Sequence, residues 1–281
     1  MDASRAFDFP KPESKSVSEQ KLSELFCAPN ADVVFVSSDD VLFKVHGAYL
    51  NLAISMIFAK VFEDTSFGTD PVQLTERADV LEILFRFIEL PSPSVLDMEQ
   101  QLFFEVAEAA EKYVVYGLMN VCFTRMQQIY ANFPLEVLNH CAMHGYSKLT
   151  DQAAEKALRY PLNKVVLTLK APALLAQYVM YYTNYRRAGK KIGDKIYWIV
   201  SRTNCHIWTR IYGMYYQKVE RNPLLFDQIP SVENVRTIND EIVCTDEDDE
   251  CPCDTNTMHK TLQKECVELR KTIPKFSAVS L

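Results

Sequence analysis

The sequence predicts an α+β fold that is predominantly helical. Glycine is scarce, with 7 residues in 281, which favours packed helices over turn-rich β sandwiches. Apolar residues recur at the spacing of amphipathic helices through most of the chain. Strand-like runs are short and lie in residues 32–45 and 72–74. The hydrophobic content of 48%, with 16 Phe and 14 Tyr, is sufficient for a buried core.

The first strand-like segment, residues 32–45, predicts a β-hairpin. Two runs rich in Val and Phe flank a Ser/Asp turn. Residues 46–62 follow with the stripe of an amphipathic helix, and residues 72–74 suit a third short strand. The apolar run 80–88 predicts a helix that Pro91 stops. Strands this short are not stable alone, so we expect the neighbouring helices to cover them.

Two further helices are expected between residues 97 and 129. Asp97 is a suitable N-cap for the first, which reaches Tyr113 with apolar residues on one face. Gly117 allows a break in the chain. The second helix then continues with an apolar stripe from Leu118 to Ile129.

Beyond Pro134 no strand-like alternation recurs, and the pattern predicts successive helices to Arg221. One helix covers residues 135–144 and ends at Gly145, and Asp151 caps the next. We therefore expect a second domain that is entirely helical.

The predicted organisation has four parts. A polar stretch rich in Ser, Lys, Glu and Pro predicts a disordered tail at 1–21. The α+β domain occupies 22–131 and the helical domain 132–221. Residues 222–281 form an acidic linker, loosely attached, with one last helix over about 258–272.

The charge pattern opposes binding to nucleic acid. The formal net charge is -7, whereas neutralising phosphates needs a cluster of Lys and Arg. The densest basic run is short and lacks interleaved aromatic residues, which favours a solvated helix end and loop. It consists of Arg186, Arg187, Lys190 and Lys191.

No membrane association is expected. The N-terminal residues contain no apolar signal-like region, and the apolar stretch Ala171–Tyr182 is too short to cross a bilayer. We expect an intracellular protein, cytoplasmic or nuclear, whose 8 cysteines are mostly buried thiols.

Specific residues in the first domain match a known pattern. They are Asp32-Val33, Phe43-x-x-His46-x-x-x-Leu50, Ser55-x-x-Phe58-x-x-x-Phe62, and Ala109 to Tyr113 with Gly117-Leu118 behind it. In these positions the chain resembles the BTB/POZ family over about residues 30–130, most closely the large group in mushroom-forming fungi. The helices from Pro134 onward are similar to the BACK-like segment that often follows such a domain.

The resemblance implies a small three-stranded sheet flanked by helical hairpins. It also implies a homodimer formed through the first helices and the N-terminal segment, and recruitment of another protein. It brings no catalytic residue and no cofactor. The motif positions that it marks are Asp32, Phe43, His46, Leu50, Ser55, Phe58, Phe62 and Tyr113.

Two more specific functions follow from the same family. One is a substrate adaptor that binds a cullin in a ubiquitin ligase, but such members carry a hydrophobic-x-Glu signature shortly after the position of Phe62. Residues 63–68 read EDTSFG here, so the glutamate is displaced. The other is a transcriptional co-regulator, which the absence of recognisable zinc fingers disfavours. A scaffold for protein interactions is therefore the favoured function.

Catalytic and metal-binding interpretations are weaker. His46 is better explained as a structural residue, because no nucleophile and orienting acid accompany it. His140 and His144 lie four apart on a helix, but a third ligand is missing and His144 precedes the helix end at Gly145. An enzyme using Cys141 with a nearby histidine is the remaining catalytic alternative.

The C-terminal cysteines are the stronger candidates for zinc. Paired Cys-x-x-Cys knuckles are missing, so ordinary thiols in a flexible loop are the favoured interpretation. The candidate ligands are Cys205, Cys244, Cys251 and Cys253, with Cys266, His206 and His259 elsewhere.

Overall fold

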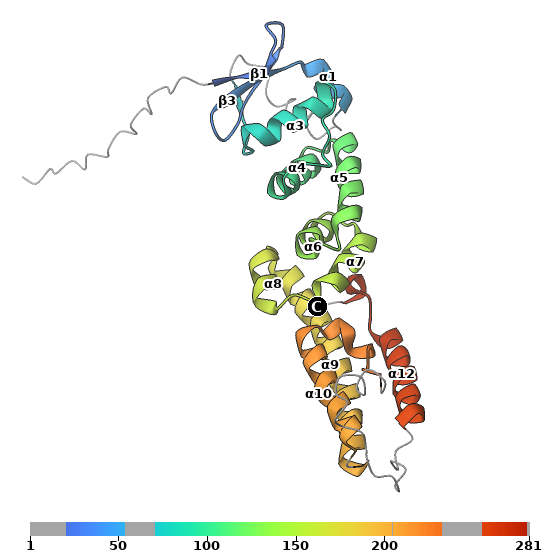
Figure 1. The fold of residues 1–281 in the computed structure, drawn as a ribbon. Helices are drawn as coiled ribbons and strands as arrows, with labels where there is room; N and C mark the ends of the chain where they lie inside the picture. The colour runs from blue at the N-terminus through green and yellow to red at the C-terminus, as the bar shows by residue number, and fades with distance from the viewer. Residues whose placement is uncertain (1–20, 54–70, 204, 232–254, 280–281) are drawn as a thin grey trace, which may run out of the picture. The chain divides into compact units, whose positions relative to one another are not determined.

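The computed structural model describes residues 21–53, 71–203, 205–231 and 255–279 (Figure 1). The chain divides into two compact units, residues 1–123 and 124–281. The first unit contains a small mixed sheet with helices, and the described part of the second is helical. The predicted α+β class with predominant helix is confirmed.

Within the described residues, the sheet of the first unit has four strands, not the three predicted. They are β1 (Lys21–Cys27), β2 (Val33–Val36), β3 (Val41–Val45) and β4 (Val72–Gln73), in the order β1-β3-β2-β4. The β2/β3 hairpin is antiparallel, as predicted, while β1 pairs with β3 and β4 pairs with β2 in parallel.

Strand β1 was not predicted from the sequence, because its apolar pattern does not alternate. Ser23 and Phe26, three residues apart, are its buried positions. The pairing with β3 shifts register between Leu22 and Cys27, and this irregularity breaks the two-residue period of a regular strand. Residues 22–27 were expected to lie within the ordered domain, but not as a strand.

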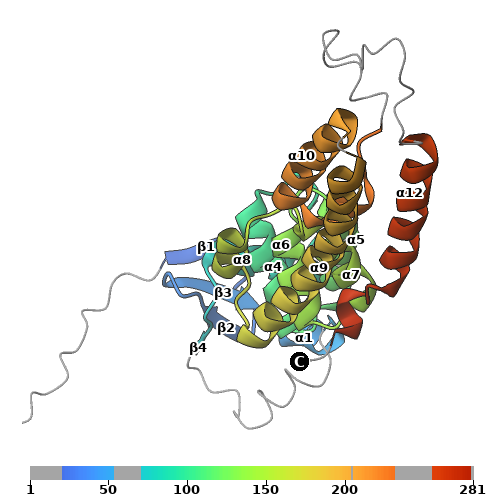
Figure 2. The same cartoon turned by 90° about the horizontal axis from the view of Figure 1, so that it is seen from below.

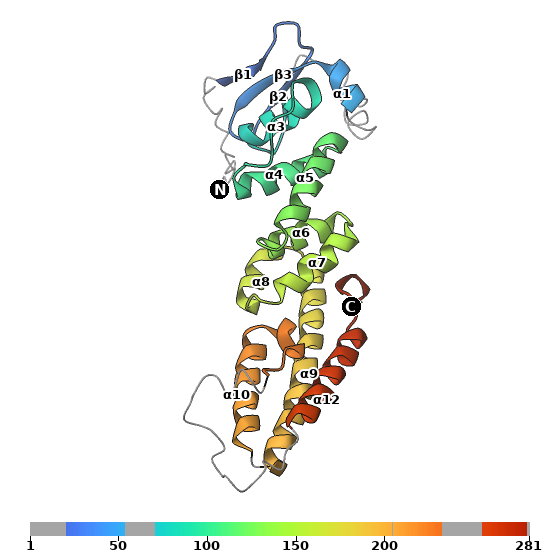
Figure 3. The ribbon, with the colours of Figure 1, turned by 45° about the vertical axis from the view of Figure 1, so that its right-hand side comes forward.

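Four helices begin within the described residues of the first unit. They are α1 (Gly47–Ala53), α3 (Ala78–Glu89), α4 (Gln100–Lys112) and α5 (Tyr116–Ile129). Helix α3 covers one face of the sheet (Figure 3). It buries Val80, Leu81, Leu84 and Phe85, as the apolar run predicted.

Phe85 is the centre of the packing between helix and sheet. Its ring lies 5.7 Å from Phe26 of β1, 5.1 Å from Phe35 of β2 and 5.5 Å from Phe43 of β3, measured between centroids. All four side chains are at most 2% exposed. Rings at these separations attract one another in addition to the area they bury. Phe85 of α3 therefore packs against β1, β2 and β3 at once.

Two predicted boundaries of helices in this unit are wrong. The N-cap of α4 is Glu99, whose carboxylate accepts a hydrogen bond from the Leu102 amide at 3.1 Å, and not Asp97. The break before α5 lies at Val114, with φ of 56°, while Gly117 lies inside the helix. The Val115 amide donates to the Ala110 carbonyl, so Val114 occupies the left-handed position of a Schellman motif that glycine usually fills.

The described part of the second unit is a succession of helices. They are α6 (Pro134–Met143), α7 (Ser147–Ala157), α8 (Leu162–Thr168), α9 (Pro172–Thr203), α10 (His206–Arg221), η1 (Pro223–Asp227), α12 (Thr255–Thr272) and η2 (Phe276–Ala278). The end of α6 before Gly145, which has φ of 80°, and the last helix are confirmed. No described helix has the length and hydropathy needed to cross a membrane.

Asp151 has a different role from the predicted cap. It lies inside α7, and its carboxylate accepts hydrogen bonds from the amide and hydroxyl of Ser277, at 2.7 and 3.1 Å. Phe276 is buried against Tyr178 and Tyr181 of α9. The described C-terminal residues therefore pack onto the helices, contrary to the expectation of a loose attachment.

Helix α12 is also fixed to the second unit by an ion-pair network. Arg270 pairs with Asp227 of η1 and, at 3.0 Å, with Glu155 of α7. Although burial lowers the pKa of Arg270, the charge and hydrogen bond of Asp227 raise it overall, so the guanidinium stays charged. Three elements distant in sequence are thus joined by one side chain.

The long helix α9 lies beside α10 and α12 (Figures 1 and 2). The basic run from Arg186 to Lys191 lies in the middle of α9, and not at the predicted helix end and loop. Gly189 faces α10 closely, because a Cβ built there would lie 2.5 Å from a methyl carbon of Val219. Gly213 on α10 has no such neighbour within 4 Å.

Two glycine substitutions should therefore have opposite effects. We expect Gly189→Ala to lower the free energy of unfolding by about 1–3 kcal/mol, because the stiff Val219 side chain must move. Gly213→Ala should raise it by about 0.5–1 kcal/mol through helix propensity alone. Urea titrations followed by tryptophan emission measure both, since Trp198 and Trp208 lie in the second unit. Equal effects of the two substitutions would contradict the close approach of the helices.

Candidate interaction surface and other candidate sites

The junction between β3 and α1 contains two of the predicted motif residues. The Asp32 carboxylate accepts a hydrogen bond from the Gly47 amide at 2.6 Å. The His46 ring bonds to the carboxylate of Glu89 at the end of α3, and the His46 amide donates to the same carboxylate at 3.3 Å. These contacts join the hairpin, α1 and α3. They are consistent with a structural role for His46.

The other described motif residues lie in the core. Phe43 is 1% exposed, Leu50 is 3% exposed and Tyr113 is 6% exposed. Their contacts support the fold and leave little of them for a partner to touch. The three remaining motif positions, Ser55, Phe58 and Phe62, lie outside the described residues, as does the segment 63–68.

A network around Glu76 fixes the loop between β4 and α3. Its carboxylate accepts hydrogen bonds from Lys112 at 2.6 Å and from the Tyr113 hydroxyl at 2.5 Å. Burial raises the pKa of Glu76, but the hydrogen bonds from Lys112 and Tyr113 outweigh it and hold the pKa below its usual value. Burial of the phenol raises the pKa of Tyr113, and the hydrogen bond and charge of the same carboxylate raise it further.

The hairpin turn docks onto this loop. The Ser38 amide donates to the Glu76 carbonyl at 2.9 Å, and the Asp39 carboxylate accepts from the Ala78 amide at 2.8 Å. Although burial raises the pKa of Asp39, hydrogen bonds from Ser37 and Ala78 lower it overall. Asp40, with φ of 61°, makes the turn. The loop, the turn and the start of α3 are therefore one connected structure.

The exposed apolar side chains of this unit include two on β1. Leu22 is 39% exposed and Leu25 is 50% exposed. Strand β1 is an edge of the sheet, and within the described residues no further strand pairs with its outer side. An edge strand with exposed leucines can pair with another chain and bury those leucines. The prediction from sequence missed this surface because it missed the strand.

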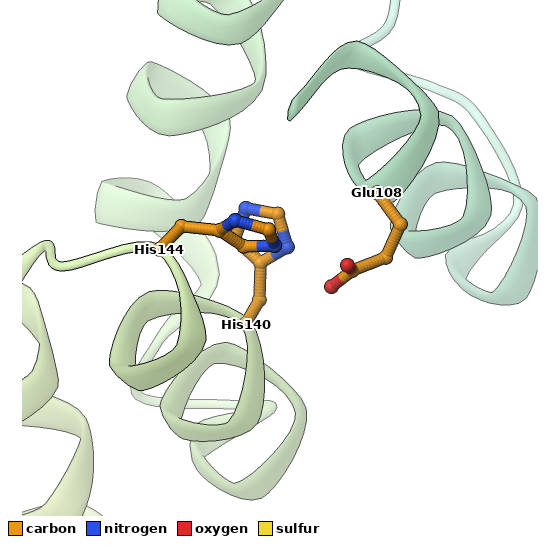
Figure 4. Close-up of side chains that lie close together, drawn as sticks. All are labelled: Glu108, His140 and His144. Atoms are coloured by element: carbon orange, nitrogen blue, oxygen red, sulfur yellow. The ribbon is translucent and has the colours of Figure 1, made fainter. Parts of the chain in front are cut away.

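His140 and His144 lie one turn apart on α6 (Figure 4). Their ring centroids are 4.6 Å apart, and the His140 ring stacks on Tyr146 at 6.3 Å. His144 is the C-cap residue of α6, where an imidazole interacts well with the helix end. Glu108, the third side chain labelled in Figure 4, belongs to the first unit.

Two of the described zinc candidates, Cys266 and His259, are engaged in other bonds. The Cys266 thiol donates to the Phe226 carbonyl at 3.8 Å, and burial raises its pKa to about 12, whereas zinc binds the thiolate. The His259 ring donates to the Pro230 carbonyl at 3.1 Å. Cys205 is buried and His206 is exposed at the start of α10. The other candidates, Cys244, Cys251 and Cys253, lie outside the described residues.

Within either unit taken alone, the described residues contain no group of three His, Cys, Asp or Glu side chains close enough to hold one metal ion. Cys141, the nucleophile of the enzymatic alternative, is fully buried.

No family model matches the chain, and no curated protein and no solved structure matches it.

The Glu76 network predicts a pH dependence of stability. Because its pKa is lowered on folding, Glu76 stabilises the native state above about pH 4.5, its usual pKa, and this contribution is lost as the pH falls. We expect Glu76→Gln to destabilise the protein near pH 7 but to lose less stability than the wild type between pH 6 and pH 3. Urea midpoints followed by circular dichroism measure this.

Asp97→Asn is the matched control, since Asp97 is an exposed carboxylate in the loop before α4, outside the network and away from β1. It should leave the acid-induced loss unchanged. If Glu76→Gln lost stability between pH 6 and pH 3 as steeply as the wild type, the assignment of this pH dependence to Glu76 would be wrong.

Proposed function

We propose that the chain is a non-enzymatic interaction protein that self-associates through its first unit and recruits a partner protein through its helical second unit. The observation that carries self-association is the outer edge of β1, where Leu22 and Leu25 are exposed and no other described strand pairs with the sheet. A second copy can satisfy that edge, because strand addition supplies backbone hydrogen bonds and pockets for alternate side chains.

The resemblance to BTB/POZ domains supports the same function. The described elements follow the expected order of hairpin, helix, short strand and further helices. Asp32, His46 and Tyr113, three of the matching positions, connect elements of the first unit to one another. We therefore propose a BTB-like domain, with a BACK-like helical extension as the recruiting unit.

The chemistry of the edge favours a symmetric dimer. In a two-fold interface the same patch meets itself, so β1 of one copy contacts β1 of the other. A stable interface of this kind needs on the order of 1,000 Å² or more of buried surface. Two edge strands alone supply less, so we propose that the first helices and the N-terminal segment also contribute, as the resemblance to BTB/POZ domains implies.

A charge placed on β1 should prevent the association. We expect Leu25→Glu to abolish co-purification of two differently tagged copies expressed together, because a carboxylate would be buried without a partner. Leu96→Glu is the matched control, since Leu96 is 56% exposed, against 50% for Leu25, and lies in a loop of the same unit. That variant should co-purify like the wild type.

Co-purification of Leu25→Glu at the wild-type level would remove β1 from the interface. Circular dichroism spectra of both variants establish that each remains folded.

A further inference from the structure

A groove lies between α9 and α10 of the second unit, with a cavity volume of about 430 Å³. This is within the usual range of ligand sites, about 300–1,000 Å³. Figure 2 shows the two helices side by side. The groove is open in the middle because Gly193 presents no side chain, and its nearest cross-helix atom is a Tyr215 ring carbon 3.8 Å from where a Cβ would lie.

The floor of the groove is held rigidly. The Tyr215 hydroxyl donates to the Phe226 carbonyl at 2.8 Å and to the Gly189 carbonyl at 3.3 Å. Tyr215 is 1% exposed and Val219 is 6% exposed beside it. These contacts fix the spacing of the two helices, so the groove is formed before any ligand arrives.

The two helices carry a local excess of positive charge. Across α9 and α10 Lys and Arg outnumber Asp and Glu by nine to two, whereas the whole chain has 30 basic and 37 acidic residues. Arg186 is neutralised by Glu220 at 3.3 Å. Arg187 and Lys190, both exposed at the groove, pair with no carboxylate among the described residues.

Tyrosine side chains continue the groove along the same face. The rings of Tyr197, Tyr212 and Tyr216 follow one another with centroid separations of 5.8 and 6.2 Å. Tyr197 is 58% exposed and Tyr216 is 56% exposed. Tyrosine and arginine are the residues that most often dominate the energy of protein interfaces, because they combine apolar area with polar ends.

We propose that this groove binds an extended acidic segment of the recruited partner protein, an inference that rests on the proposed function. Carboxylates of the segment pair with Arg187 and Lys190, and its apolar side chains pack on Tyr212 and Tyr216. Bidentate pairing of a carboxylate with the guanidinium of Arg187 adds geometric specificity to the charge attraction.

An acidic peptide fits this groove better than a nucleic acid does. Asp194 and Glu220 line the groove together with the basic residues. A nucleic acid carries a charge on every phosphate, so some of its phosphates would face these carboxylates. A peptide can place acidic residues opposite the cations alone.

Selection of peptides tests the proposal. Random peptides of about 12 residues displayed on phage are selected on the full chain, and fluorescein-labelled copies of those enriched are titrated by anisotropy. We expect the enriched peptides to contain more Asp and Glu than the library does. We expect Arg187→Glu with Lys190→Glu to weaken their binding at least about tenfold, and Tyr216→Ala at least about threefold.

The control is Lys260→Glu with Lys264→Glu, which makes the same change of net charge at exposed positions of α12 outside the groove. It should change the affinity less than about twofold. An equal loss in the control would assign the effect to net charge and overturn the proposal. The proposal would also be overturned if the enriched peptides were not rich in Asp and Glu, or if the groove variant bound them with unchanged affinity.

Two further outcomes would assign the groove to another occupant and overturn the proposal. One is tighter binding of a labelled oligouridylate that the groove variant abolishes. The other is peptide binding that appears only when residues 246–250 are replaced by serine, which would make the chain's own acidic run the occupant. A chain that is dimeric in the same preparation but binds no acidic peptide refutes the groove alone and leaves self-association standing.

Discussion

The packing of Phe85 against three strands is the interaction on which the first unit depends. A small sheet of short strands is not stable in water by itself, because its apolar face must be covered. Phe85 contacts Phe26, Phe35 and Phe43 at once, so α3 covers β1, β2 and β3 through one residue. The hydrogen bonds of His46 and Glu76 then fix the ends of the same helix.

This arrangement explains why the motif residues are poor candidates for direct recognition. The polar groups of Asp32, His46 and Tyr113 form hydrogen bonds within the first unit. The ring of Phe43 packs in the core. A motif of this kind specifies a fold, and the surfaces that the fold exposes are left for function. In the first unit the surface that we propose for self-association is the edge of β1, and in the second the surface that we propose for partner binding is the groove between α9 and α10.

Much of the fold could be predicted from the sequence, because the hairpin has two Val- and Phe-rich runs around a Ser/Asp turn and α3 has a regular apolar period. The missed features lack such a local signal. The irregular pairing of β1 hides its strand pattern, and Val114 adopts a backbone conformation that its side chain disfavours. Asp151 resembles a helix cap in sequence, but its partner Ser277 lies 126 residues away.

The groove could not be predicted from the sequence either, because it has no local sequence signal. The basic run on α9 has no aromatic residues interleaved with it in sequence, yet packing of α10 places Tyr212 and Tyr216 in the same groove as Arg187 and Lys190. Pairing of the two helices depends on Gly189, because a side chain at that position would collide with Val219 of α10. The sequence alone does not show that these two residues meet. Side chains that meet across elements are fixed by tertiary packing and not by spacing.

Self-association is the central claim, and the mass of the wild-type chain in solution tests it most directly. Sedimentation equilibrium at micromolar concentration should give twice the monomer mass of 32.3 kDa. A mass of 32.3 kDa throughout that concentration range would contradict it.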